Sequence, residues 1–160
     1  MTTDIEIVHA QPAHADAIAP VFDTYRCWYG MQSDPEGARY FISQRLIQNE
    51  SEIFFARHQE EILGFTQLYP LFSSVSMDRI WLLNDLFIAE TARRTGVGSL
   101  LLQTAAEFAR SLGALRLQLE TKHDNLAAQA AYEALGWQRD SEFFNYTLDL
   151  TDASKGPADE

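Results

Sequence analysis

The spacing of hydrophobic residues in the first part of the chain predicts one strand and then one helix. A short apolar run at 5–8 is typical of a strand. Beyond it, apolar residues recur at i, i+3, i+4 and i+7, which indicates an amphipathic helix over 13–28. The recurring positions are Ile18, Val21, Phe22 and Tyr25.

A second helix is signalled by three consecutive residues. Asp34 is a capping residue, Pro35 suits the first helical position, and Glu36 places an acid in the first turn. We expect the buried stripe of this helix to be Ala38, Phe41, Ile42 and Leu46.

Period-two patterns dominate the middle of the chain. Runs at 53–57 and 62–69 flank the polar turn 58–61 and predict a hairpin. The serine-rich segment 70–79 is expected to be a loop. The next run, 81–88, is apolar on both faces and therefore predicts a central strand.

The last part of the chain alternates between the two periods. A helix should run from the glycine-containing loop to about 112, where Gly113 ends it. Its buried stripe is expected to be Leu101, Ala105, Phe108 and Leu112. The remaining predictions are a strand at 115–121, a helix capped by Asp124 or Asn125 and closed at Gly136, and a final hairpin of 137–140 with 143–150.

This order of elements predicts an α/β (mixed α+β) fold. Strands that alternate with helices favour parallel pairing, and hairpins require antiparallel pairing. We therefore expect a central mixed sheet of about seven strands with helices on both faces. A chain of 160 residues is typical of one domain. That domain should occupy 1–150, followed by a disordered polar tail at 151–160.

Composition excludes several classes of function. The formal net charge of -11 argues against binding to nucleic acid or to an anionic membrane. No apolar run is long enough to span a bilayer, and the acidic start does not resemble a signal peptide. Cys27 is the only cysteine, and the four histidines lack ligand spacing, so we expect no metal and a cytoplasmic setting.

The most informative motif is Arg93-x-x-Gly96-x-Gly98, between a predicted strand and a predicted helix. Glycines at a helix start let a phosphate approach the unpaired N–H groups and the positive end of the helix dipole. No Gly-Lys-Ser/Thr follows, which excludes a P-loop. A dinucleotide fingerprint needs a small residue at the position of Leu101. The remaining Arg-x-x-Gly-x-Gly pattern predicts a site for a doubly phosphorylated ligand, and the alternative is a glycine-rich helix start without a ligand.

Three motifs in order resemble the GNAT superfamily of acetyl-CoA-dependent N-acetyltransferases. They are the run Asn84-Asp85-Leu86-Phe87-Ile88, the Arg93-x-x-Gly96-x-Gly98 loop, and Asn125 followed by Ala131-Tyr132-Glu133-Ala134-Leu135-Gly136-Trp137. Within the superfamily, the first run and its loop look most like the diamine (spermidine/spermine-type) branch.

The resemblance implies a cofactor site for acetyl-CoA. The fourth strand would splay from the fifth, and the pantetheine arm would pair with the backbone around Leu86, Phe87 and Ile88. Asn125 would bond the same arm, and Tyr132 would reach the thioester sulfur. The diphosphate would rest on one segment, which consists of Arg93, Arg94, Thr95, Gly96, Val97, Gly98 and Ser99. By the same resemblance the acceptor pocket would draw on Tyr25, Trp28, Tyr29, Asp34, Glu36 and 72–78, and the protein would be a homodimer.

Acyl transfer to an amine needs a base, an acid and oxyanion donors. An alkylammonium has a pKa of about 10.4, so a proton must be removed at neutral pH. The diamine branch has a glutamate at the position of Asn84, and an amide cannot accept that proton. Asp85 is the nearest candidate base, with Glu120 acting through water as the alternative.

Strand alternation places Asp85 beside Trp81, Leu83 and Phe87. Tyr132 is the candidate acid for the departing thiolate, because a phenol has a pKa of about 10 and a thiol one of about 8.5. Backbone donors for the oxyanion are expected at a strand bulge near 86 or 87.

The sequence thus predicts a metal-independent N-acetyltransferase that acts on a primary amine of a small molecule. Three alternatives remain open: a protein or peptide N-acetyltransferase, a catalytically silent acyl-CoA sensor, and a nucleotide-binding αβ domain outside this superfamily. The sequence does not identify the acceptor amine.

Overall fold

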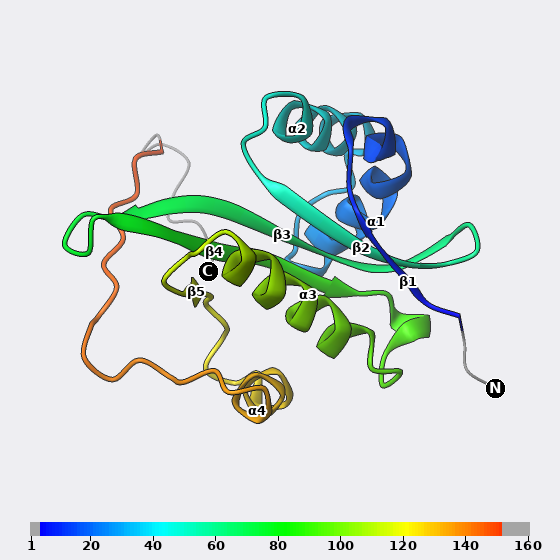
Figure 1. Cartoon of the computed structure of the whole chain (residues 1–160). Helices are drawn as coiled ribbons and strands as arrows, with labels where there is room; N and C mark the ends of the chain where they lie inside the picture. The colour runs from blue at the N-terminus through cyan, green and yellow to red at the C-terminus, as the bar shows by residue number, and fades with distance from the viewer. Residues whose placement is uncertain (1–3, 152–160) are drawn as a thin grey trace. The chain divides into compact units, whose positions relative to one another are not determined.

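The computed structural model describes residues 4–151, whose contacts group into two compact units, one ending at Asn125 and the other beginning at Leu126. The first unit contains a five-stranded sheet in the order β1-β2-β3-β4-β5. Its strands are β1 (Glu6–His9), β2 (Glu52–His58), β3 (Glu61–Ser73), β4 (Asp78–Ile88) and β5 (Leu117–Gln118). Neighbours are antiparallel except β4 and β5, which are parallel. The predicted mixed sheet is confirmed (Figure 1).

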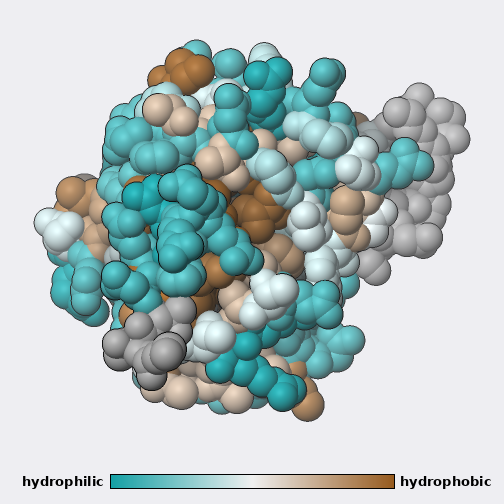
Figure 2. Space-filling model, turned by 90° about the vertical axis from the view of Figure 1, so that its right-hand side faces the viewer, coloured by the Kyte–Doolittle hydropathy of each residue, from teal (hydrophilic) through white to brown (hydrophobic). Residues whose placement is uncertain are grey.

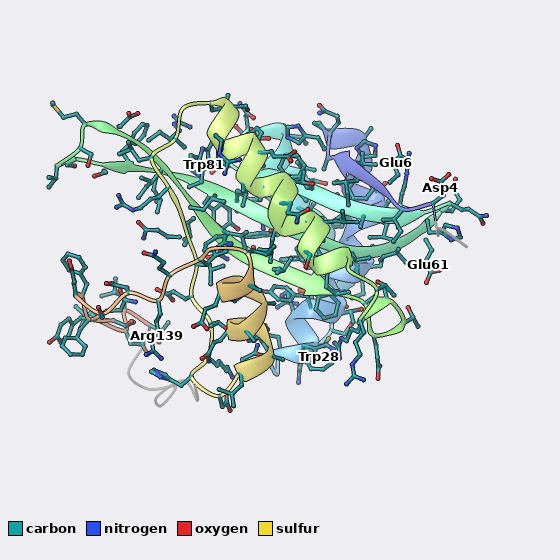
Figure 3. The ribbon with its side chains drawn as sticks, turned by 60° about the horizontal axis from the view of Figure 1, so that its bottom comes forward. Asp4, Glu6, Trp28, Glu61, Trp81 and Arg139 are labelled. Atoms are coloured by element: carbon teal, nitrogen blue, oxygen red, sulfur yellow. The ribbon has the colours of Figure 1, made fainter. Side chains whose placement is uncertain are left out.

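Helices cover both faces of this sheet (Figure 1). They are α1 (Ala15–Trp28), α2 (Pro35–Ile47) and α3 (Val97–Ser111), with short 3-10 turns η1 (Pro12–His14) and η2 (Glu90–Ala92). α1 and α2 enclose a core on one face that includes Ile18, Phe55 and Phe65. α3 covers the other face, where the ring of Phe108 meets the edge of Trp81, the residue labelled on β4 in Figure 3.

The start of α2 follows the predicted capping chemistry. The Asp34 carboxylate accepts a hydrogen bond from the N–H of Gly37 at 3.0 Å. Pro35 occupies the first helical position, where its missing N–H costs nothing. A side-chain cap of this kind satisfies one of the donors that every helix start leaves open.

Two residues assigned to buried helix stripes are exposed instead. Phe41 is 36% exposed, with its ring stacked on that of Phe22 and the guanidinium of Arg45 also over it. Leu112 is 57% exposed because it follows the last turn of α3, just before Gly113 turns the chain with a φ of +75°. Hydrophobic periodicity predicts which face of a helix points inward, but not how many residues of that face other elements bury.

The loop predicted over 70–79 is shorter than expected. β3 and β4 keep their antiparallel register out to the pair Ser73 and Asp78, so the turn occupies only 74–77. Pro70 lies within β3 opposite Trp81. Proline interrupts a strand only where the N–H that it lacks would bond to a neighbouring strand. The sequence alone does not show whether the N–H at a given position would form such a bond.

β5 is also shorter than the strand predicted over 115–121. It pairs with β4 at only two positions, Trp81 with Leu117 and Leu82 with Gln118. Beyond Leu82, no strand within residues 4–151 lies beside β4 on the β5 side. The pairing of these two strands therefore ends halfway along β4.

The second unit contains α4 (Leu126–Ala134), which closes at Gly136 with a φ of +92°, as predicted. The predicted hairpin of 137–140 with 143–150 is wrong, because no strand is formed there and the sheet has five strands rather than seven. The apolar alternation is present, but Phe143 and Tyr146 are 77% and 94% exposed. Alternation indicates strand propensity without supplying a partner for the backbone. Most of the predicted tail, 152–160, lies outside the described residues.

Hydrophilic side chains, with apolar patches between them, make up most of the face seen in Figure 2. Within residues 4–151, no helix combines the length and the hydropathy needed to cross a bilayer.

Candidate functional site

The glycine loop ends in a helix start with open backbone donors. Gly96 has a φ of +87° and is the N-cap of α3, and Arg94 before it also has a positive φ, 63°. The first hydrogen bond of the helix runs from the N–H of Leu100 to the carbonyl of Gly96 at 3.1 Å. The N–H groups of 97–99 donate to no group within the part of the chain that the structure describes. Three donors at the positive end of α3 are thus available to an anion.

Glycine occupies positions 96 and 98 of the loop for different physical reasons. Gly96 adopts a left-handed conformation that other residues reach only with strain. Gly98 does not need its small size for the packing of α3 on the sheet. A Cβ there would meet the Ile88 side chain at 3.7 and 3.8 Å, which is ordinary contact. The packing of the protein therefore does not explain a glycine at 98, whereas the close approach of a ligand would explain it.

Side chains of the loop have separate roles. The guanidinium of Arg93 lies 4.3 Å from the ring centre of Trp28, and its Nε donates to the carbonyl of Ile88 at 3.4 Å. Thr95 donates its hydroxyl to the carbonyl of Ala92. Val97 is buried in the core, whereas Arg93, Arg94 and Ser99 are exposed. The predicted segment therefore offers its backbone and its arginines to solvent and anchors itself through Val97.

A β-bulge in β4 corrects the predicted surroundings of Asp85. Gln67 pairs with Asp85 and the next residue of β3 pairs with Leu83, so Asn84 is an extra residue without a partner in the ladder. A bulge interrupts the alternation of faces. Trp81 consequently packs under α3, whereas Phe87 belongs to the core beneath α1 and α2. The expectation that Asp85 lies beside Trp81 is wrong, and the bulge lies at 84 rather than near 86 or 87.

Asp85 is held on the α1 and α2 side by three neutral donors. Its Oδ1 accepts from the Tyr25 hydroxyl and from the Asn84 amide, both at 3.0 Å. Its Oδ2 accepts from the Gln67 amide at 2.9 Å, and Gln67 in turn accepts from the Ser51 hydroxyl at 2.8 Å. Asp85 is only 6% exposed, and Gln67 and Ser51 are also buried. This network fixes the position of the carboxylate.

The carboxylate faces a cavity of about 310 Å³ between α1, α2 and the β3–β4 pair. Its lining consists of Phe22, Tyr25, Arg26, Gly37, Ala38, Phe41, Tyr69, Asn84 and Asp85. Burial, followed by the nearby Asp85, raises the pKa of Tyr69 to about 12. The same two causes raise the pKa of Tyr25 above its usual range. Both phenols are therefore protonated at neutral pH.

Sequence reasoning missed several members of this site, including Gln67 and Tyr69. The signal for Gln67 was present, because a polar amide stands in the middle of an apolar strand run. Such a residue is rarely buried without a polar partner. Tyr69 carried no comparable signal, since an aromatic residue near a strand end is ordinary.

The predicted pantetheine segment lies on β4 beyond the point where β5 stops. Leu86, Phe87 and Ile88 pair with Thr66, Phe65 and Gly64 of β3. Phe87 is buried, and Leu86 and Ile88 are partly buried. Their other edge has no neighbouring strand within the described residues.

The remaining candidates lie at the end of the first unit and in the second. Glu120 follows β5. Asn125 directly precedes α4, and its N–H donates to the carbonyl of Lys122 at 3.1 Å. Tyr132 lies in the middle of α4, partly buried, with its ring centre 6.0 Å from that of Trp137.

The residues named for the acceptor pocket lie in different places. Of them, only Tyr25 lines the cavity at Asp85. Trp28, labelled at the C-terminal end of α1 in Figure 3, is exposed, and Asp34 caps α2. The 72–78 hairpin borders a separate hollow of about 770 Å³ with Leu112. Within residues 4–151, no three His, Cys, Asp or Glu side chains are grouped to hold a metal ion.

Known proteins match this chain over most of its length. The sequence model of the acetyltransferase (GNAT) family matches residues 18–137. An "uncharacterized N-acetyltransferase YhfO" of Bacillus subtilis is 45% identical over 91% of this chain and 98% of its own. A "probable acetyltransferase" of Haemophilus influenzae is 32% identical over 72% of this chain and 80% of its own. A crystal structure of a "probable acetyltransferase" superposes with a TM-score of 0.86 at 48% identity, over 92% of this chain and 99% of that one.

Proposed function

The chain belongs to the acetyltransferase (GNAT) family, whose members use acetyl-CoA, and we propose that it transfers the acetyl group to a primary amine of a small molecule by direct attack in a ternary complex. The observation that carries the cofactor part is the start of α3. Three N–H groups, those of 97–99, are open there, and one of them belongs to Gly98, whose small size the fold itself does not need. A diphosphate matches that charge and that space.

The rest of the cofactor would lie along two elements. We assign the diphosphate to the segment from Arg93 to Ser99, with the two arginines as charged partners. The pantetheine arm would pair with the open edge of β4 at 86–88 and bond Asn125. Support for this assignment comes from the early end of β5, which leaves backbone groups of β4 without a strand neighbour in the described residues.

The reaction forms an N–C bond to the amine and breaks the C–S bond of the thioester. The ammonium must therefore lose two protons, one before attack and one as the tetrahedral intermediate collapses; the departing thiolate takes up one proton, and one is released to solvent. We assign removal to Asp85, with Glu120 acting through water as the alternative, and donation to Tyr132. The bulge at Asn84 frees backbone donors that suit a developing oxyanion.

One observation keeps a second function under consideration. Asn84 is an amide at the position where the diamine branch has its glutamate, and it serves here as a donor to Asp85. A chain without an effective base would bind acyl-CoA as a sensor without turning it over. A peptide acceptor is the other alternative, and a panel of amines and peptides separates it from a small-molecule acceptor.

Thermal-shift measurements test the cofactor. Acetyl-CoA and CoA should stabilise the protein, and NAD and ATP should not; stabilisation by NAD alone would contradict the cofactor assignment. Thiol release from acetyl-CoA over polyamines, lysine analogues, aminoglycosides, amino acids and peptides then separates an enzyme from a sensor.

Two substitutions test the assigned roles. Tyr132→Phe should keep CoA affinity and slow turnover by roughly 100-fold or more if the phenol is the acid. Unchanged turnover would remove Tyr132 from that role. Asp85→Asn should flatten the rise in rate toward alkaline pH, whereas an unaltered pH profile would favour Glu120 or water.

A further inference from the structure

The cavity at Asp85 has an anionic floor and aromatic walls. Asp85 and Asn84 reach it from β4 and Tyr69 from β3, while Tyr25 comes from α1 and Phe41 from α2. Its volume of about 310 Å³ is at the lower end of the range for small-molecule sites. It equals about ten water molecules of roughly 30 Å³ each. An acceptor that fits inside has on the order of ten heavy atoms.

The negative charge on the floor is uncompensated. Within residues 4–151, the donors to the Asp85 side chain are all neutral: a phenol and two amides. Among residues 4–151, no Lys, Arg or His forms an ion pair with it. Arg26 lines the same cavity, but its guanidinium bonds Asp23 and the carbonyl of Gln32. A carboxylate that is 6% exposed and lacks a cation favours a cationic ligand.

The aromatic walls favour the same kind of ligand. The rings of Phe22, Tyr25, Phe41 and Tyr69 line the cavity. Ring faces attract a cation within about 6 Å and also accept an alkyl body. A second ammonium deep in the cavity would gain only this attraction to the rings and no carboxylate, because among the described residues Asp85 is the only acidic one that lines it and Arg26 adds a positive charge.

Resting on the proposed function, we propose that the acceptor is a compact primary monoamine. Its ammonium is bound by Asp85, and its short apolar body lies against the aromatic walls. Polyamines and short diamines are then poor acceptors, because a second ammonium would lie among rings without a carboxylate. The number of carboxylates in the cavity sets the number of charges that the acceptor carries.

Three ligands with the same heavy-atom count test this on the unaltered protein. Butylamine and 1,3-diaminopropane have equal length and differ in one methyl replaced by an ammonium, and 1-butanol has the same length without charge. Titration calorimetry into the complex with CoA, which cannot transfer an acetyl group, measures binding alone. Butylamine should bind at least about 10-fold more tightly than either of the others.

Asp85→Asn tests the source of the preference. It should weaken butylamine roughly 10- to 100-fold and leave 1-butanol unchanged. Asp16→Asn, the same change at an exposed position of α1, should alter neither affinity. Equal or tighter binding of the diamine, absent binding of butylamine, or unchanged affinity of the Asp85 variant would overturn the inference. The ligand comparison decides it even if that variant does not fold.

Thiol release distinguishes this inference from the proposed function. If butylamine binds in the expected order but releases no thiol from acetyl-CoA, the transferase proposal fails and the selectivity of the cavity stands. If amines are acetylated without preference for one charge, the function stands and the selectivity fails.

Discussion

A methyl group added at Gly98 separates the needs of the fold from those of the cofactor. The new Cβ would lie 3.7 and 3.8 Å from carbons of Ile88, so it causes no clash. Gly98 lies in the first turn of α3 with a helical conformation that alanine can also adopt. Alanine lowers the conformational entropy of the unfolded chain, which favours the folded state. Gly98→Ala should therefore leave the free energy of unfolding unchanged or raise it by about 0.5 kcal/mol.

The same methyl group should weaken CoA. It projects where a diphosphate would approach the N–H groups of 97–99, and displacement of that group from its donors lengthens several charge-assisted hydrogen bonds. Loss of a single such bond corresponds to about 1.5 kcal/mol or more, which is about 10-fold in affinity. We expect at least that loss for both CoA and acetyl-CoA.

Gly96→Ala is the matched control, because it makes the same chemical change two residues earlier. A Cβ at 96 meets nothing within 4 Å, but the φ of +87° costs alanine about 1–2 kcal/mol. Urea unfolding followed by tryptophan fluorescence gives the stabilities, and calorimetry gives the CoA affinities. Full CoA affinity in a stable Gly98→Ala protein would refute the diphosphate site.

Three further predictions concern stability. Gln67→Leu removes the donor to Asp85 Oδ2 and should cost about 2–5 kcal/mol in urea unfolding, whereas Gln103→Leu on the exposed face of α3 should stay within about 0.5 kcal/mol. The fold raises the pKa of Tyr69 to about 12, so the protonated phenol stabilises the folded state. That stabilisation is complete below pH 10 and is lost as the pH rises toward 12. Tyr69→Phe should therefore lessen the decline in the free energy of unfolding between pH 10 and 12. Asp34→Ala should cost about 1 kcal/mol, and a loss below 0.3 kcal/mol would contradict its capping role.

The helices of the first unit could be predicted because their signals are local. The Asp34 cap, the 13–28 periodicity and the terminating Gly113 each act within one or two turns. The lengths of β3 and β5 could not be predicted in the same way. Pairing of Pro70 with Trp81, and the end of β5 at Gln118, depend on register between distant segments.

The candidate site divides along the same line. The glycine loop could be predicted from the sequence because the residues that form it are consecutive and lie at a helix start. The cavity at Asp85 was not, since its lining comes from four elements and includes Tyr69 and Phe41, whose types are ordinary in a core. The buried Gln67 is the exception, because an amide within an apolar strand run needs a hydrogen-bond partner and so signals a polar site.

The bulge at Asn84 explains why the acid and the opening in the sheet occur together. One extra residue in β4 reverses which face the following side chains occupy, so Asp85 enters the cavity under α1 rather than the core under α3. A bulge also increases local twist, and pairing with β5 ends at Leu82, two residues before it. A regular β4 would bury Asp85 against α3 and favour continued pairing with β5. A single local irregularity thus accounts both for an acid that faces the cavity proposed for the acceptor and for the open strand edge proposed for the cofactor arm.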